Sequence, residues 1–281
     1  MRKLSKILAI ETSGQVAGCA LYDGGQITAE FNVQNKKTHS QSLLPMMDEL
    51  RRVMELDLKT VDAIALTAGP GSFTGLRIGA ATAKGLGLAL DKPLLPVPTA
   101  DALAYNLYGS DALICPLMDA RRQQVYTGIY TFAEKKEAQC ANAAQADKVQ
   151  TASSPFERAL SLRVLHPQCV VPLSEIVAAL NEYDRNVIFL GDGVPVYAAA
   201  LAAQMKAPYS FAPAHLSRQR AAATAALAAQ YYGERGEAAL VESDAFRPEY
   251  LRLSQAERDR AAGVDTSQTR RTGDAAVERE A

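Results

Sequence analysis

The stretch VDAIALTAGPGSFTGLRIGAATAKGLGLAL, residues 61–90, joins a strand pattern to a helix pattern through a glycine-rich turn. Its first part is a continuous apolar run, which is typical of a strand buried on both faces. Its second part predicts a helix from about Thr74 to Leu90 that stops near Asp91-Lys92-Pro93. Because a buried strand that leads directly into a helix is the building unit of α/β proteins, this stretch indicates that fold class.

The same alternation precedes this stretch. KILAIETS, residues 6–13, predicts a strand, and residues 16–34 predict two more strands joined by a turn at Asp23-Gly24-Gly25. A helix should follow, because apolar residues repeat at helical spacing at Leu43, Met47, Leu50 and Met54. Later in the chain, residues 186–194 predict another strand, and Ser217 to Tyr232 predict a helix that stops at Gly233.

The opening pattern recurs in the middle of the chain. ALICPLMDARRQQVYTGIY, residues 112–130, again reads as a strand, an acidic residue, a polar turn and a strand; when Glu11 is set over Asp119, Tyr22 falls on Tyr130. This recurrence predicts a duplicated fold with two related subdomains. We expect the first at residues 1–105, completed by a helix at 214–233, and the second at 106–213 with 234–254. Residues 133–172 have a weak pattern, and the charged segment 255–281 is expected to be disordered.

Composition excludes several classes of protein. The 281 residues include 30 Lys and Arg against 31 Asp and Glu, so a strongly basic nucleic-acid-binding surface is not expected. No apolar run is long enough to cross a membrane, and no signal peptide is recognisable, so we expect a cytoplasmic protein. The four cysteines form no CxxC pair and the three histidines have no metal-ligand spacing, so no metal site is predicted.

Three short segments carry groups that could contact a nucleotide. Glu11-Thr12-Ser13 and Asp119 each place an acidic residue at the end of a strand, where the ligands of open α/β sheets bind. Gly191-Asp192-Gly193 follows another strand and would let a base or ribose approach the backbone. The alternative for each segment is an ordinary turn or cap. The glycine-rich loop at residues 68–75 does not have the spacing of a Walker A motif.

The helix that follows this loop has an unusual face. Gly75, Gly79, Ala83 and Gly87 recur every four residues and form one smooth ridge, which we call the small-residue ridge. A glycine inside a helix costs about 1 kcal/mol relative to alanine, so something must pack closely against this ridge. That something is either the chain's own sheet or a helix of another protein, and the sequence leaves both open.

The motifs quoted above, together with HSQSLLPMMDEL (39–50) and PEYLRLSQAE (248–257), resemble the TsaB family. This family is a bacterial subunit for making threonylcarbamoyladenosine in tRNA. The resemblance is close over residues 6–132 and looser over 187–257. It implies a duplicated actin-like, Hsp70-like ATPase (ASKHA) fold. It also implies a non-catalytic subunit that binds and activates a metal-bearing TsaD-like subunit, which transfers threonylcarbamoyl to adenosine 37 of tRNAs that read codons beginning with A.

The resemblance also assigns partners and residues. TsaD carries a metal-binding His-x-x-x-His pair, and Thr99 and Leu103 stand at the corresponding places here, so this chain is expected to lack the metal. The other expected partners are a TsaE-like P-loop ATPase, a second copy of the chain, and tRNA only through the complex. No cofactor is required, although ATP or ADP binding stays open. The expected partner interface comprises Leu43, Met47, Leu50, Phe73, Gly75, Leu76, Arg77, Gly79, Ala83, Leu86 and Gly87.

An alternative of another class keeps the nucleotide site. The chain would then be a nucleotide-dependent phosphoryl or carbamoyl transferase that uses Glu11 and Asp119 around a magnesium–nucleotide complex. The absent histidine pair argues against a third possibility, a metallopeptidase.

Overall fold

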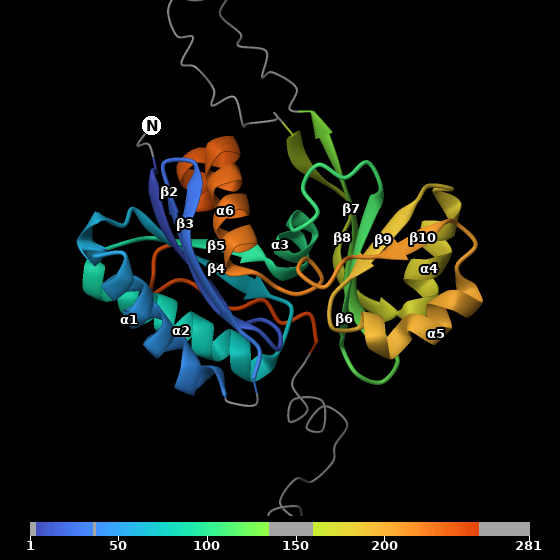
Figure 1. Cartoon of the computed structure of the whole chain (residues 1–281), viewed down its shortest axis with the longest axis horizontal. Coiled ribbons are helices and arrows are strands. Elements are labelled where there is room, and N and C mark those ends of the chain that lie inside the picture. The colour runs from blue at the N-terminus through green and yellow to red at the C-terminus, as the bar shows by residue number, and fades with distance from the viewer. Residues whose placement is uncertain (1–3, 36–37, 135–159, 253–281) are drawn as a thin grey trace, which may run out of the picture. The chain divides into compact units, whose positions relative to one another are not determined.

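The computed structural model describes residues 4–35, 38–134 and 160–252 (Figure 1). Residues up to Glu249 belong to one compact unit, and a second unit begins at Tyr250. The predicted disorder of residues 255–281 lies outside the described residues.

The first sheet holds the opening strands and the strand that was read from residues 61–69. Its order is β3-β2-β1-β4-β5, with β1 (Lys6–Glu11), β2 (Ala17–Asp23), β3 (Gln26–Val33), β4 (Ala63–Gly69) and β5 (Leu94–Pro98). β1, β2 and β3 are antiparallel, whereas β4 and β5 run parallel to β1. Gly24 and Gly25 both have positive φ, 57° and 97°, which confirms the predicted hairpin turn.

The second sheet repeats this arrangement. It comprises β6 (Leu113–Asp119), β7 (Gln124–Glu134), β8 (Leu160–Pro172), β9 (Val187–Leu190) and β10 (Tyr209–Phe211) in the order β10-β9-β6-β7-β8. In each sheet the first strand of that half, β1 or β6, lies in the centre. An antiparallel hairpin flanks it on one side and parallel strands flank it on the other. The repeat confirms the predicted duplicated α/β fold.

The helices cover both faces of the first sheet. α1 (His39–Val53) and α2 (Phe73–Leu90) pack on one face, and α6 (Ala221–Arg235) packs on the other (Figure 1). α3 (Thr99–Tyr105) lies between the two sheets and contacts strands of both. The second sheet is covered by α4 (Leu173–Glu182) and α5 (Val194–Gln204), and short 3-10 turns occupy Leu58–Thr60 and Gly236–Ala239.

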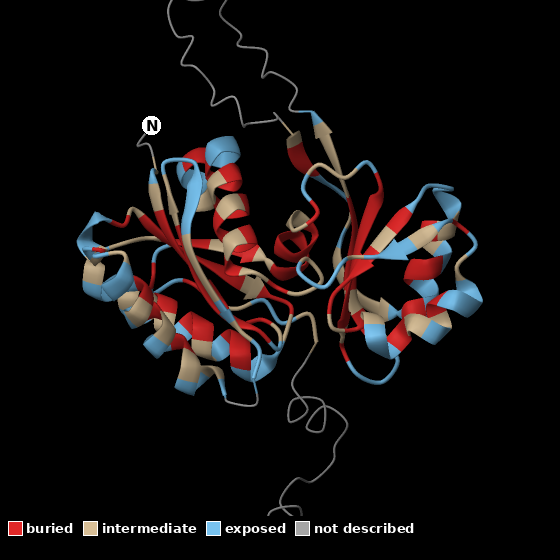
Figure 2. Ribbon diagram, viewed as in Figure 1, coloured by how far each residue is buried: buried red, intermediate tan, exposed pale blue. Residues whose placement is uncertain are grey.

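One hydrophobic cluster joins the two halves of the unit, and we call it the seam. It combines Ile7 and Ala65 of the first sheet with Ile114 and Tyr130 of the second and with Leu227 of α6. Figure 2 shows this interior as buried residues on both sides of α3 and α6. Because these side chains are buried together, the two halves share a core. No helix among the described residues is long and apolar enough to cross a membrane.

The structure corrects two predicted boundaries and adds a strand that the sequence did not predict. The last helix continues past Gly233 and ends at Arg235. Gly236 caps it, and its positive φ of 61° suits a glycine. Residues after 234 were assigned to the second subdomain, but Val241 pairs with Leu94 of the first sheet. The weak pattern of residues 133–172 also concealed the strand β8, which pairs with β7 along its length.

Candidate functional site

The first candidate site is the loop after β1, and its centre is the carboxylate of Glu11. This side chain is 1% exposed. Its Oε1 accepts hydrogen bonds from the backbone N–H of Ser13 at 2.7 Å, from the Ser13 hydroxyl at 2.5 Å and from the Thr67 hydroxyl at 3.3 Å. Its Oε2 accepts one from the Thr224 hydroxyl at 3.4 Å. Burial raises the pKa of Glu11, and the hydrogen bonds from Ser13, Thr67 and Thr224 lower it only in part.

The loop around Glu11 is closed by the chain itself. Ser13 is fully buried, and its carbonyl oxygen accepts a hydrogen bond of 2.7 Å from the backbone N–H of Ser72, at the start of α2. A Cβ atom on Gly71 would collide with that carbonyl, and one on Gly14 would lie 2.6 Å from the amide nitrogen of Gln219. Gly71 is therefore needed because the backbone of Ser13 approaches it closely, whereas the atom beside Gly14 is the end of a flexible side chain.

The predicted second acidic site is better exposed but is also engaged. Asp119 accepts hydrogen bonds from the backbone N–H of Arg121 at 2.8 Å and from the Tyr197 hydroxyl at 3.2 Å, and it forms an ion pair with the Arg121 guanidinium at 3.2 Å. Gly191 and Gly193 pack against the carbonyl group of Leu117, which lies two residues before Asp119.

At the first place, groups that could bind a nucleotide phosphate are engaged by the chain itself. A phosphate loop needs free backbone N–H groups and open space. At the first place the N–H and hydroxyl of Ser13 both donate to Glu11, and Gln219 fills the space beside Gly14.

The two residues that correspond to the histidine pair of TsaD lie inside the protein. Thr99 and Leu103 lie on α3 in the seam, 0% and 1% exposed. Asp101, between them, is also buried, and it accepts hydrogen bonds from two tyrosines. Among the described residues there is no group of three or more His, Cys, Asp or Glu side chains arranged to hold a metal ion.

The small-residue ridge faces inward, so internal packing is the alternative that the structure supports. A Cβ atom on Gly75 would collide with the carbonyl oxygen of Thr12, and one on Gly79 with the Thr12 hydroxyl. A Cβ atom on Gly87 would collide with Ser243, and Ala83 is fully buried. The idea that this ridge meets a partner's backbone is therefore wrong, because the loop after β1 and the segment near Ser243 already cover it.

Other residues expected at the partner interface are also part of the core. Leu43, Met47 and Leu50 of α1 and Leu76 of α2 are between 0% and 8% exposed. They can therefore support an interface by packing under it, but they offer a partner little contact area. Three of the expected residues reach the surface or its edge: Phe73, Arg77 and the half-buried Leu86. The Arg77 guanidinium lies 3.9 Å from the centre of the Phe73 ring.

The outer side of the same two helices is apolar, and sequence reasoning missed the residues that make it so. Leu44 is 56% exposed and Leu88 is 65% exposed. Between α1 and α2 lies a hollow of about 170 Å³, with the ion pair of Asp48 and Arg51 at its edge. Its apolar lining includes Leu44, Met47, Leu50, Leu56, Leu58 and Leu86. We call the exposed apolar side chains of α1 and α2, together with this hollow, the α1/α2 face. The sequence could have indicated it, because these helices carry large apolar residues outside their core-facing positions.

A larger hollow of about 510 Å³, lined by several polar residues, lies at the N-terminal ends of α1 and α2. Its lining includes Gln15, Gln34, Thr38, Ser72 and His39, whose Nε2 lies 2.9 Å from the carbonyl oxygen of Gly14. Because that carbonyl only accepts, Nε2 carries the proton, and His39 acts as a structural tie.

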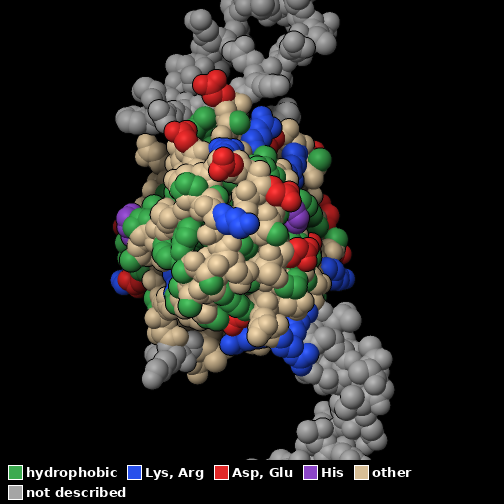
Figure 3. Space-filling view, turned by 90° about the vertical axis from the view of Figure 1, so that its right-hand side faces the viewer, with side chains coloured by type: hydrophobic (Ala, Val, Ile, Leu, Met, Phe, Trp, Pro, Cys, Tyr) green, Lys and Arg blue, Asp and Glu red, His purple; other side chains and the backbone are tan. Residues whose placement is uncertain are grey.

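A second face with exposed apolar side chains lies over the other half. Figure 3 views the molecule from this side, where hydrophobic side chains lie among uncharged ones and charged groups are scattered. Val196 of α5 is 61% exposed and Phe211 of β10 is 45% exposed. The apolar side chains of this face are about as exposed as those of the α1/α2 face. Substitutions here can therefore serve as controls for substitutions on the α1/α2 face.

Comparison with known proteins assigns the family. The family model described as "TsaD: tRNA N6-adenosine threonylcarbamoyltransferase" matches residues 27–260. The "tRNA threonylcarbamoyladenosine biosynthesis protein TsaB" of Bacillus subtilis (strain 168) is 32% identical over 251 residues, which cover 89% of this chain and 96% of that protein. The protein of the same name from Escherichia coli (strain K12) is 33% identical over 127 residues, 44% of this chain and 54% of that protein.

A solved structure agrees with this assignment. "YeaZ from Pseudomonas aeruginosa" is 26% identical and superimposes with a TM-score of 0.66 over 88% of this chain and 100% of that chain. The match along nearly the whole length of the Bacillus protein, together with the duplicated fold, places the chain: it belongs to the TsaB family of tRNA threonylcarbamoyladenosine biosynthesis proteins.

Proposed function

We propose that this chain is a non-catalytic subunit that binds and activates a metal-bearing TsaD-like subunit. That subunit transfers the threonylcarbamoyl group to adenosine 37 of tRNAs that read codons beginning with A. The family assignment supports a role in making threonylcarbamoyladenosine, because the relatives carry that role in their names. The division of labour between the two subunits is our proposal.

One observation carries the proposal: the polar groups at the candidate catalytic positions are buried or hydrogen-bonded to other groups of the same chain. Glu11 is buried under four hydrogen bonds, and the metal positions Thr99 and Leu103 are buried in the seam. A catalytic acid or base must reach its substrate, whereas the Glu11 carboxylate is 1% exposed and its oxygens accept hydrogen bonds from Ser13, Thr67 and Thr224. This argues for a role in binding and against the transferase alternative through Glu11 and Asp119.

The α1/α2 face is the surface that we assign to the TsaD-like partner. Leu44 and Leu88 expose large apolar side chains there, and the hollow between the helices can accept an apolar side chain from the partner. Covering such a face removes apolar surface from water, which is the main favourable contribution to association. When the partner is absent, the same face can pair with a second copy of the chain, which accounts for the homodimer that we expect.

A substitution at the exposed part of this face tests the proposal. Leu88→Asp puts a charge on the exposed side of α2, and loss of one large apolar contact with a partner there costs about 2 kcal/mol or more, roughly a 30-fold weaker affinity. The matched control is Val196→Asp on α5, which has nearly the same exposure, 61% against 65%. Affinity for the purified TsaD-like subunit is measured by calorimetry, and modification of tRNA by the mixture is measured in parallel.

Two outcomes contradict the proposal in different ways. If Leu88→Asp binds as tightly as the unchanged chain while Val196→Asp does not, the interface lies on the other half. If the chain alone modifies tRNA without the metal-bearing subunit, the non-catalytic role is wrong. The same reconstitution tests two further parts of the proposal: docking of a TsaE-like P-loop ATPase on the pair, and contact with tRNA only through the complex.

A further inference from the structure

Asp101 of α3 is a buried carboxylate that no part of the proposed function uses. It is 6% exposed. Its Oδ1 accepts a hydrogen bond from the Tyr130 hydroxyl at 2.8 Å, and its Oδ2 accepts one from the Tyr231 hydroxyl at 2.5 Å. Tyr130 belongs to β7 of the second sheet, and Tyr231 belongs to α6, which packs on the first sheet. One side chain therefore ties together elements from both halves of the unit.

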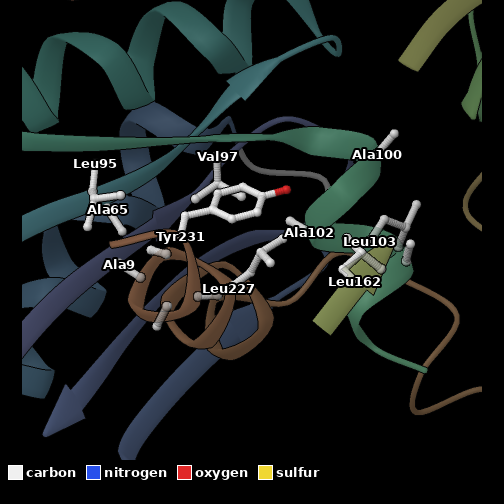
Figure 4. Close-up of a cluster of buried hydrophobic side chains, with 14 of the residues drawn as sticks. Ala9, Ala65, Leu95, Val97, Ala100, Ala102, Leu103, Leu162, Leu227 and Tyr231 are labelled. Carbon is white, nitrogen blue, oxygen red and sulfur yellow. The ribbon is translucent and has the colours of Figure 1, made fainter. Parts of the chain in front are cut away.

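The surroundings of this carboxylate are the apolar seam. Figure 4 shows the Tyr231 ring among apolar side chains, with its hydroxyl reaching toward α3. The labelled neighbours include Leu95 and Val97 of β5, Leu103 of α3 and Leu227 of α6. Besides the two tyrosines, the charged groups that act on Asp101 are Arg235, whose guanidinium lies over the Tyr231 ring at 4.2 Å, and Glu249.

We propose that Asp101 is a pH-dependent latch of the seam: as a neutral acid it lets α3 pack fully against β7 and α6, and as a carboxylate it loosens that packing. A neutral acid can accept from one tyrosine hydroxyl and donate to the other, because a hydroxyl group both donates and accepts. The carboxylate keeps both hydrogen bonds, but it holds a negative charge among apolar side chains, where water cannot solvate it. Loosening the seam admits water and relieves that cost.

The sign of the pH effect follows from burial. Burial raises the pKa of Asp101, and the hydrogen bonds from Tyr231 and Tyr130 and the charge of Arg235 offset this only in part. A carboxyl whose folded pKa lies above its unfolded pKa contributes most to stability when it is protonated. That contribution is lost as the pH rises from about 3.9, the ordinary pKa of Asp, through the raised folded pKa. The closed seam is therefore favoured at low pH and loosens toward neutral pH.

The test compares the full chain with Asp101→Asn, which keeps the shape and removes the charge. Hydrogen exchange of residues 99–105 and 124–134 is measured at several pH values between 4.5 and 8 and corrected for the intrinsic pH dependence of exchange. In the unchanged chain we expect protection to fall with rising pH, by about tenfold for each pKa unit by which burial has raised Asp101. In Asp101→Asn, protection should not vary with pH. Asp111→Asn removes an exposed carboxylate and should behave like the unchanged chain.

Further variants keep the proposal testable if Asp101→Asn does not fold. Tyr130→Phe and Tyr231→Phe each remove one hydroxyl that stabilises the carboxylate, so the loss of protection should continue to a higher pH. Tyr105→Phe is the control, because Tyr105 lies on the same helix, α3, and its ring packs against Tyr108 and Phe132. Identical pH profiles in the unchanged chain, Tyr130→Phe and Tyr231→Phe would overturn the latch, and so would protection that rises with pH.

Discussion

Gly75→Ala distinguishes an inward-facing ridge from an outward-facing one. The added Cβ atom would collide with the carbonyl oxygen of Thr12, which belongs to the backbone of a buried loop and cannot swing aside. Extra volume in a closely packed interior costs about 1–3 kcal/mol, and the gain in helix propensity from glycine to alanine is at most about 1 kcal/mol. We therefore expect a net loss of roughly 1–2 kcal/mol, which lowers the melting temperature by a few degrees.

The matched control lies on the same helix. Gly85 is exposed, and a Cβ atom there would meet no atom within 4 Å, so Gly85→Ala should stabilise the chain by about 0.5–1 kcal/mol. Both free energies of unfolding are measured by urea titration followed by circular dichroism, on the chain alone. If Gly75→Ala proves as stable as the unchanged chain, or stabilises it as Gly85→Ala does, the ridge is open to solvent and our assignment of its packing is wrong.

The other predictions concern buried and partly buried carboxylates. Glu30 accepts a 2.8 Å hydrogen bond from the backbone N–H of Ala222 at the start of α6 and pairs with Arg220. Burial alone would raise the pKa of Glu30, but these hydrogen bonds outweigh it and lower the pKa. Glu30→Gln should thus cost about 1–2 kcal/mol at pH 7, and the loss should vanish as the pH falls below the pKa of Glu30; equal losses at pH 7 and pH 3 would contradict this. Burial raises the pKa of Glu11, so the unchanged chain should lose stability relative to Glu11→Gln as the pH rises above about 4.3. A gain in stability over the same pH range would show that the pKa of Glu11 is lowered instead. Calorimetric titration with Mg-ATP should show no binding, whereas tight binding that Asp119→Ala abolishes would restore the transferase alternative.

Local patterns were enough to predict most elements around the candidate site. The apolar run before Gly69 predicted β4, and the helical spacing of Leu43, Met47 and Leu50 predicted α1 and its buried side. The duplication was also visible, because Glu11 and Asp119 end equivalent strands. These predictions succeeded because strand and helix periodicity depend on neighbours a few residues away.

The partners of the buried polar groups were not predictable in the same way. Glu11 meets Thr224, and Asp101 meets Tyr231, across more than a hundred residues of chain. Nothing near Gln219 in the sequence marks it as the residue that fills the space beside Gly14. The strand β8 was missed for the same reason, since it is defined by its pairing with β7 more than by its own pattern.

The sequence by itself determined the α/β class, the duplication, the hairpin at Gly24-Gly25 and the presence of a ridge that something must cover. The tertiary structure decided what covers it, namely Thr12 and Ser243 of the same chain, and it left Leu44 of α1 and Leu88 of α2 exposed. The physical reason is that periodicity shows which residues share a face of a helix. Whether that face meets the chain's own core or another molecule depends on segments that only folding brings together.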